Sequence, residues 1–147
     1  MAVLKKETIY TIDNIYALPD GERAELIDGK IYYMAPPSRA HQQILFSLGR
    51  KIADYIDSKN GNCEVNIAPF AVFLNNDDIN YVELDISVIC EQSKLDDKGC
   101  HGAPDWIVDV EKRVITVYRF EKETMEEYTF GEDVPAGIYE GFSLKVE

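Results

Sequence analysis

Two short apolar segments in the middle of the chain, residues 82–90 and 106–110, most strongly limit what this sequence can fold into. Both are rich in β-branched residues and bounded by polar residues, glycine or proline, which predicts buried strands. Each carries an aspartate where a buried strand normally avoids charge, Asp85 in the first and Asp109 in the second. Such carboxylates must be paired or must face a positive group such as a divalent metal ion. Alternatively, both lie on the solvent side of a half-exposed sheet, and the periodicity favours neither interpretation.

The length of 147 residues fits one domain, residues 1–147, that is large enough to form a hydrophobic core without disulfides. No run of about 18 apolar residues is present, and the N-terminal residues lack the apolar core of a signal peptide. We therefore expect a cytoplasmic protein with no membrane partner. The three cysteines, Cys63, Cys90 and Cys100, show no CxxC spacing, which indicates neither a disulfide framework nor a zinc site. Cys63 and Cys90 are interpreted as small core residues.

The chain is strongly acidic, with 15 basic and 27 acidic residues and a net charge of −12. This charge repels nucleic acid at long range, so DNA is a disfavoured partner. The argument is not decisive, because metal-dependent nucleases concentrate acidic residues at the site and can assemble a basic groove by dimerising.

Turn-forming residues and hydrophobic periodicity predict the secondary structure of the first half of the chain. Residues 8–15 contain a short helical turn, and residues 22–34 form two antiparallel strands joined at Asp28-Gly29. Ser38 is the predicted N-cap of an amphipathic helix that ends at residues 60–61. His41 lies in the first turn of this helix, off the apolar stripe, where a histidine is more often a capping or packing residue than a ligand.

The second half is predicted to be rich in strands. Residues 63–74 form a long strand bent at Pro69, and residues 91–103 form a polar loop. After a tight turn at residues 111–113, alternating patterns predict antiparallel strands at residues 114–120 and 125–130. The tail at residues 137–147 is expected to lie along the sheet. The result is an α+β chain with one main helix.

Several motifs follow one another in a specific order. They are ELIDGKIYYMAPPSRAHQQI at residues 25–44, APF at 68–70, ELDISVIC at 83–90, SKLDDKG at 93–99 and GAPD at 102–105. In this order they resemble the Uma-type putative restriction endonuclease family, which belongs to the PD-(D/E)XK nuclease superfamily. The resemblance covers most of the chain. It implies a restriction-endonuclease-like mixed β-sheet with one main helix, an N-terminal hairpin and C-terminal antiparallel strands.

The resemblance also implies a metal-dependent phosphodiesterase site. By motif position Asp85 corresponds to the aspartate of the family's Pro-Asp pair, with Leu84 in place of the proline. Asp109 falls where the family has a glutamate four residues after GAPD, and its side chain is one methylene shorter. Two carboxylates on neighbouring strands can hold Mg²⁺ or Mn²⁺, which polarises a phosphate and makes bound water more acidic.

The chain departs from the family pattern directly after GAPD. Family members continue with a turn, a lysine-bearing helix and a further strand, whereas here GAPD runs straight into Trp106. The resemblance thus implies a shortened domain that lacks one strand and one helix, and Asp109 could occupy either the metal-binding position or the turn of the later strand. Glu111 has the wrong charge to replace the missing lysine, which leaves Lys112 as a substitute. Because losing a charge-stabilising group slows such reactions, we expect a weakened or inactive nuclease.

Three functions remain open. The first is a Mg²⁺- or Mn²⁺-dependent endonuclease with Asp85 and Asp109 as metal ligands, Glu25 or His41 as auxiliary groups and Lys112 as a substitute base. The second is a non-catalytic protein that keeps the nuclease fold for binding or assembly. The third, a small acidic partner of a basic protein, depends on net charge alone. Because the missing helix would uncover an apolar patch on the sheet, the sequence also predicts a homodimer.

Overall fold

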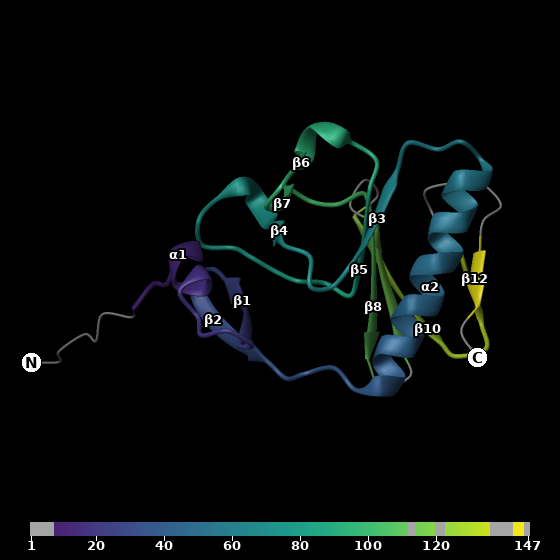
Figure 1. The fold of residues 1–147 in the computed structure, drawn as a ribbon. Coiled ribbons are helices and arrows are strands. Elements are labelled where there is room, and N and C mark those ends of the chain that lie inside the picture. The colour runs from purple at the N-terminus through teal and green to yellow at the C-terminus, as the bar shows by residue number, and fades with distance from the viewer. Residues whose placement is uncertain (1–7, 112–113, 120–122, 136–142, 146–147) are drawn as a thin grey trace, which may run out of the picture.

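The computed structural model describes residues 8–111, 114–119, 123–135 and 143–145 (Figure 1). Its elements in chain order are α1 (Ile12–Tyr16), β1 (Arg23–Ile27), β2 (Lys30–Met34), α2 (Arg39–Ser58), β3 (Glu64–Ile67), β4 (Val72–Phe73), η1 (Leu74–Asn76), β5 (Ile86–Ile89), η2 (Gln92–Lys94), β6 (Leu95–Asp96), β7 (Gly99–His101), β8 (Trp106–Glu111), β9 (Val114–Arg119), β10 (Thr124–Thr129), β11 (Asp133–Pro135) and β12 (Ser143–Lys145). One long helix among many strands confirms the expected α+β class.

The N-terminal hairpin forms where the sequence predicts it. Strands β1 and β2 pair antiparallel, and Ile27 lies opposite Lys30 across the turn. The two turn residues, Asp28 and Gly29, have φ values of 48° and 78°. Both values lie in the left-handed region that a tight two-residue hairpin turn requires, and Asp-Gly adopts it readily. The local sequence therefore sets the register of the hairpin.

Helix α2 is the main helix and begins, as predicted, after Ser38. The Oγ atom of Ser38 accepts a hydrogen bond from the backbone N–H of His41 at 3.1 Å. Gly49 lies where α2 meets β3, and a Cβ atom there would come within 2.4 Å of Cδ1 of Ile67. The missing side chain lets the strand approach the helix closely. The buried face of α2 consists of Leu45, Leu48, Gly49, Ile52 and Ile56.

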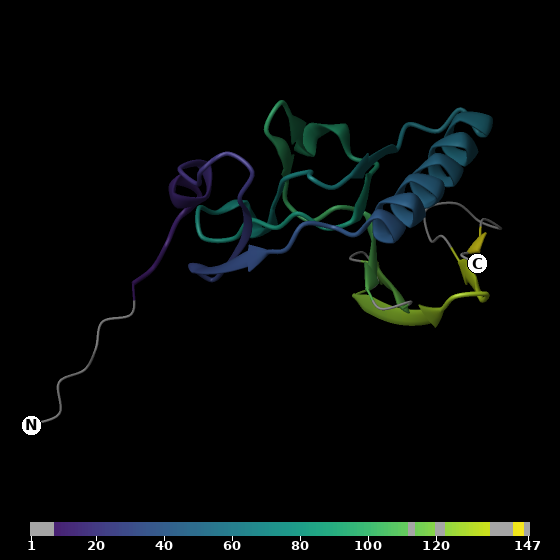
Figure 2. The same ribbon diagram turned by 60° about the horizontal axis from the view of Figure 1, so that its bottom comes forward.

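The largest sheet has the strand order β10-β9-β8-β5-β3, and its four pairings are all antiparallel. In Figure 2 its β8 to β10 part curves around α2. Trp106, Val108 and Val110 of β8 pack in the same core cluster as the buried residues of α2. Strand β8 pairs with β5 on one side and with β9 on the other. A polar side chain on β8 therefore projects from the middle of the sheet and not from an edge strand.

A second, three-stranded sheet has the order β4-β7-β6, with β4 and β7 parallel. Ile89 of β5 belongs to the same buried cluster as Val72, Val82 and Cys100. The small sheet thus packs against the large one, and the two together contain both parallel and antiparallel pairs.

Three sequence-based boundaries are wrong. The strand expected at residues 63–74 is divided around Pro69 into β3 and β4, which belong to different sheets, because proline cannot donate to a strand ladder. The loop expected at residues 91–103 contains β6 and β7, which are too short to show periodicity. Within residues 82–90 only Ile86–Ile89 forms a strand. The predicted turn includes residues 112 and 113, which lie outside the described residues, as does most of the tail.

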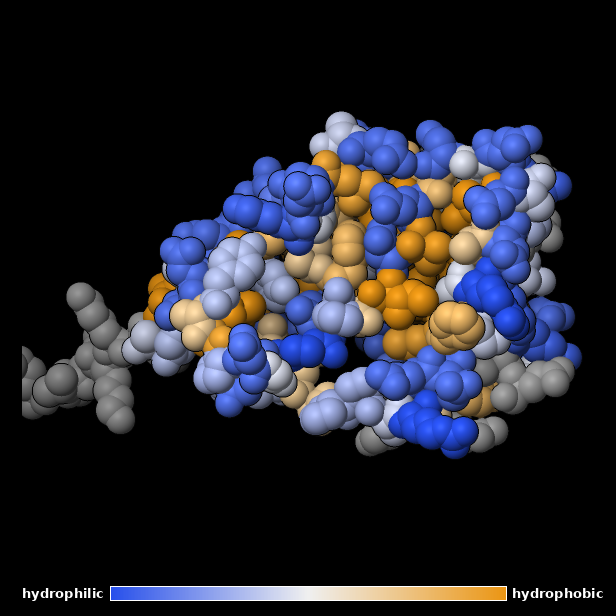
Figure 3. Space-filling model, in the orientation of Figure 1, coloured by the Kyte–Doolittle hydropathy of each residue, from blue (hydrophilic) through white to orange (hydrophobic). Residues whose placement is uncertain are grey.

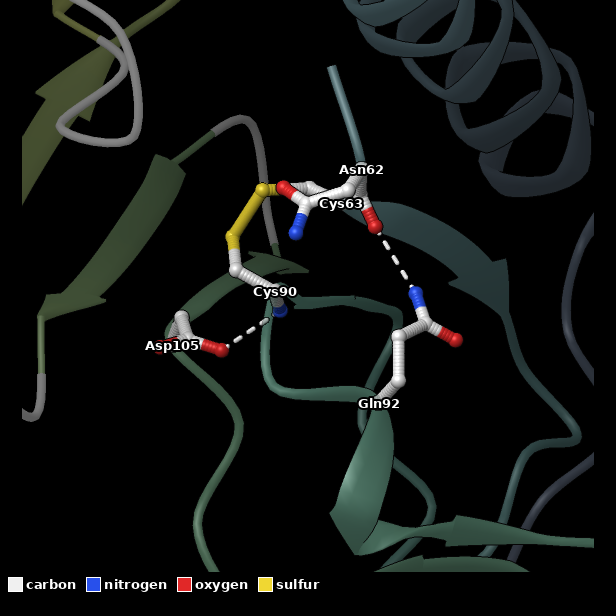
Figure 4. The surroundings of a disulfide bond; sticks show 5 residues. All are labelled: Asn62, Cys63, Cys90, Gln92 and Asp105. Carbon is white, nitrogen blue, oxygen red and sulfur yellow. Dashed lines mark hydrogen bonds between the residues drawn. A yellow bond between two sulfur atoms is a disulfide. The ribbon is translucent and has the colours of Figure 1, made fainter.

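Cys63 and Cys90 are joined by a disulfide, which the sequence analysis did not indicate (Figure 4). Both pack against the core cluster, as expected. The register sets Glu64 opposite Ile89, so the two cysteines, one position further out, meet across β3 and β5. A separation of 27 residues along the chain carries no sign of this pairing. Within the described chain Cys100 is the free cysteine, and it is buried.

Candidate metal and active site

Asp85 and Asp109 lie side by side where β5 begins beside β8. The register pairs Ile86 with Val108, and continuing it by one residue sets Asp85 opposite Asp109. Oδ1 of Asp109 accepts a hydrogen bond from the backbone N–H of Asp85 at 3.3 Å. Oδ2 of Asp85 accepts one from the backbone N–H of Val110 at 2.7 Å. The structure therefore brings together the two carboxylates that the sequence singled out.

The local pattern of β8 explains how a carboxylate comes to lie here. Val108 and Val110 belong to the core cluster shared with α2. Because side chains alternate along a strand, Asp109 leaves the sheet on the other face. Asp109 is half-buried, and the side chain of Asp85 is 17% exposed. Neither is the exterior, solvent-facing carboxylate of the alternative interpretation.

His41 joins the site from the first turn of α2. Its Nε2 atom lies 3.1 Å from Oδ1 of Asp85, in a partly buried hydrogen bond. Its backbone N–H is the group that Ser38 caps. His41 is therefore both a residue of the capped turn and a neighbour of the acidic pair. The N-cap fixes the backbone of His41, from which its side chain extends to Asp85.

Glu25 of β1 belongs to the same electrostatic group. Burial raises the pKa of Glu25, a hydrogen bond from the backbone of Glu83 opposes the rise, and the charges of Glu83 and Asp85 add to it. On β1 the flanking residues Ala24 and Leu26 are buried in a separate core cluster, so Glu25 lies on the opposite face of the strand. The hairpin thus contributes a third carboxylate beside the pair.

Among the carboxylates in the described part of the chain, Asp109 has the most strongly raised pKa. Burial raises its pKa from 3.8 to about 6, with a further contribution from the negative charge of Asp85. The two effects act in the same direction because both disfavour the charged form. A cation between the two carboxylates would remove this penalty.

A pocket of about 490 Å³ opens beside the acidic pair. Asp85 and His41 line it, together with Arg23, Ser38 and the segment of residues 35–37 that joins β2 to α2. Figure 3 shows the surface hollowed above this segment. The space is large enough to hold a small ligand or one section of a longer chain.

The donor set fits an open magnesium-like site better than a closed site in which protein side chains supply every ligand. Among the residues that the structure describes, no group of three or more His, Cys, Asp and Glu side chains is arranged to hold a metal by itself. Mg²⁺ is usually bound through only one or two carboxylates, and water and substrate phosphates complete its coordination. Asp85 and Asp109 supply two such carboxylates beside an open pocket. The pair is therefore suited to Mg²⁺ or Mn²⁺, with the remaining positions left to water and substrate.

Lys112 and Arg23 complete the comparison between the predicted and the observed site. Lys112, the predicted substitute base, lies outside the described residues. Arg23 lines the pocket but was not singled out by the sequence analysis. The signal was present, because Arg23 and Glu25 are two positions apart on a predicted strand and therefore share a face.

Comparisons with known proteins identify the family and the fold of the chain. A family described as Uma2, putative restriction endonuclease, matches residues 12–128. No curated protein matches the sequence. A solved structure from Anabaena variabilis, titled as a putative nuclease belonging to DUF820, superposes with a TM-score of 0.60 at 19% identity. That match covers 87% of this chain and 89% of the other, and it shows that the two share a fold. Because the family match spans most of the sequence, the chain belongs to the Uma2 putative restriction endonuclease family.

Proposed function

We propose that this chain is a divalent-metal-dependent nuclease of reduced activity, in which Asp85 and Asp109 hold Mg²⁺ or Mn²⁺. The observation that carries the proposal is the cross-strand pairing of these two carboxylates beside the open pocket. Two buried like charges destabilise a fold unless they serve a ligand, which makes such a pair typical of a functional site. Family membership supplies the reaction class, phosphodiester hydrolysis, as a proposal for this chain.

The surrounding residues have separate roles in this scheme. A bound Mg²⁺ or Mn²⁺ would supply positive charge that polarises a phosphodiester and makes a coordinated water more acidic. His41 orients Asp85 through the bond to Oδ1, which fixes the direction of the carboxylate. Glu25, whose pKa is raised by burial, can accept a proton from the attacking water.

The lining of the pocket supports the proposal of reduced activity. No lysine is among the residues that line it in the described part of the chain. Removing one group that stabilises developing negative charge commonly lowers kcat by about 10²-fold or more. The same observation favours the second candidate, a non-catalytic protein that keeps the fold for binding or assembly.

Nicking of a supercoiled plasmid in Mn²⁺ separates the two candidates. We expect slow nicking by the unmodified chain and none by Asp85→Ala. Asp54→Ala, which removes an exposed carboxylate from α2, is the matched control and should nick as the parent does. Absence of nicking by the parent would leave the non-catalytic candidate, and equal nicking by Asp85→Ala would reject Asp85 as a ligand of the catalytic metal.

The expected homodimer remains a proposal. Most of the exposed large hydrophobic side chains belong to residues 9–33, around α1 and the hairpin, whereas Met125 lies on β10 of the large sheet. If a dimer forms, the hairpin region therefore offers more exposed apolar surface than the sheet face that the sequence analysis pointed to.

No helix in the described chain is long and apolar enough to span a membrane.

A further inference from the structure

Arg23 is the one arginine or lysine that lines the pocket beside Asp85, within the residues that the structure describes. It is the first residue of β1, two positions before Glu25, and the two side chains share a face of that strand. Its side chain is 29% exposed, so it is neither part of the core nor freely solvated. Its position gives an otherwise acidic site a single fixed cation.

Two further residues hold the guanidinium of Arg23 in place. Nε of Arg23 donates to Oε2 of Glu83 at 2.7 Å. The hydroxyl of Tyr81, a buried residue, donates to Oε1 of the same carboxylate at 2.9 Å. Glu83 is itself only 10% exposed. Because the carboxylate is anchored from the core side, the guanidinium that it binds is held at the pocket wall.

Most of the hydrogen-bonding capacity of Arg23 is still available. A guanidinium has five N–H donors, and the bond to Glu83 uses the one on Nε. No other acceptor among the described residues binds the side chain of Arg23. The two terminal amino groups match the paired oxygens of a phosphate, which arginine binds in a bidentate manner.

The charges of the site call for such a group. Asp85 lines the pocket, and the nearby carboxylates of Asp109 and Glu25 interact with its charge. An approaching phosphodiester would add a further negative charge. The field of Arg23 reaches this group: burial raises the pKa of Glu25, whereas the charge of Arg23 lowers it. A metal ion bound by the aspartates and the cation of Arg23 would together offset the charge of the substrate.

Arg23 also connects this pocket to a second one. A neighbouring pocket of about 480 Å³ shares Arg23, Met34, Ala35 and Pro37 with the first. The two pockets thus share a wall formed by Arg23 and the segment that joins β2 to α2. A ligand longer than one nucleotide can therefore extend from the acidic pair past the guanidinium.

From this geometry we infer that Arg23 is a phosphate-binding residue for a nucleic-acid strand that lies across the two adjoining pockets. The inference rests on the proposed function, because it assumes a phosphodiester substrate. A single-stranded oligonucleotide is the simplest probe of this contact, because the one cation of the pocket can bind one phosphate backbone.

The test is binding of a fluorescein-labelled single-stranded oligonucleotide, followed by anisotropy with Ca²⁺ as the metal. We expect Arg23→Ala to weaken binding about tenfold or more, as loss of a charge-assisted hydrogen bond does. The slope of log K against log salt should fall by about 0.7, which corresponds to one phosphate contact on a single strand. Arg23→Lys should be intermediate because it keeps the charge but loses the bidentate geometry.

Arg50→Ala is the matched control, since Arg50 is exposed on α2 and lines neither pocket. It should bind within about twofold of the parent, as expected of a distant surface charge. If Arg23→Ala fails to fold because Glu83 is left unpaired, the double variant R23A/E83Q removes both charges and should bind as weakly. Parent-like binding by the folded variant, or no binding by the parent at low salt, overturns the inference.

The outcomes also separate this inference from the proposed nuclease. Binding that depends on Arg23 without nicking in Mn²⁺ supports the phosphate site and rejects catalysis. Nicking in Mn²⁺ with binding and cleavage unchanged in Arg23→Ala supports the nuclease and overturns the role of Arg23.

Discussion

Nε2 of His41 lies 3.1 Å from Oδ1 of Asp85, so the first turn of α2 and the start of β5 meet in one hydrogen bond at the candidate metal site. Ser38 caps the turn that carries His41. The backbone N–H of Val110 on β8 donates to the carboxylate of Asp85, and the backbone N–H of Asp85 donates to the carboxylate of Asp109. The site is thus assembled from elements that are far apart in sequence. Its carboxylates are positioned by the fold before any ion binds.

The contact between His41 and Asp85 gives the first prediction. His41→Ala should weaken Mn²⁺ binding by about tenfold or more, because partners that orient a metal ligand commonly contribute that much. Isothermal titration with Mn²⁺ measures the change. His101→Ala is the matched control, since His101 forms a similar pair with Asp96 in the three-stranded sheet, with Nε2 2.8 Å from the carboxylate. Equal affinities for the two variants would show that His41 does not support the metal site.

The raised pKa of Asp109, about 6 against 3.8, predicts how stability depends on pH. Because the folded state favours the protonated form, this contribution is fully present below about pH 3.8 and is lost as the pH rises through about 6. Asp109→Asn should therefore stabilise the metal-free protein at pH 7.5, on the order of 1–3 kcal/mol. The gain should shrink toward pH 4.5.

Urea unfolding in EDTA at the two pH values measures this effect. Asn keeps an oxygen that can accept the hydrogen bond from the backbone of Asp85, so the substitution mainly removes charge. A variant that is less stable than the parent at pH 7.5, or a difference independent of pH, would show that the carboxylate is not under strain from burial and from Asp85.

The disulfide predicts the number of titratable thiols. Protein purified without reductant and unfolded in guanidinium should react with one equivalent of a thiol reagent, at Cys100. After reduction it should react with three, because Cys63 and Cys90 are released. Reduction should also lower stability by about 2–4 kcal/mol, the range typical of such a crosslink. Three reactive thiols before reduction would show that the two strands approach without forming the bond.

How much the sequence could predict depends on how local each signal is. The prediction of the hairpin is correct because Asp28-Gly29 determines the turn by local preference alone. The prediction of α2 is correct because the N-cap residue and the helical period indicate the same helix. The pairing of Cys63 with Cys90 follows from the register of β3 and β5, which no pattern in either strand reveals. The short strands β6 and β7 have too few residues to show a period.

The site was predicted in part for the same reason. Asp85 and Asp109 were recognisable because a charge interrupts an apolar strand, and the strand register places the two residues opposite each other. Arg23 was missed because an arginine at the start of an exposed hairpin looks like ordinary surface. Its anchoring by Glu83, 60 residues away in sequence, is a contact that no local pattern reveals.

The oligomeric state is a further prediction. We expect a homodimer, and light scattering at micromolar concentration should give twice the chain mass of 16.7 kDa. Tyr32 and Tyr33 on β2 are 51% and 69% exposed, so replacing both by serine removes apolar surface from the hairpin without disturbing the core. This variant should shift toward the monomer. A strictly monomeric parent would refute the prediction.

The central claim is that Asp85 and Asp109 together hold one divalent cation, and calorimetric titration with Mn²⁺ tests it most directly. The parent should bind one ion per chain. Asp85→Ala and Asp109→Asn should each abolish that binding, whereas Asp54→Ala, which changes the net charge equally, should retain it. Absence of binding to the parent, or binding that survives loss of either paired aspartate, would contradict the claim.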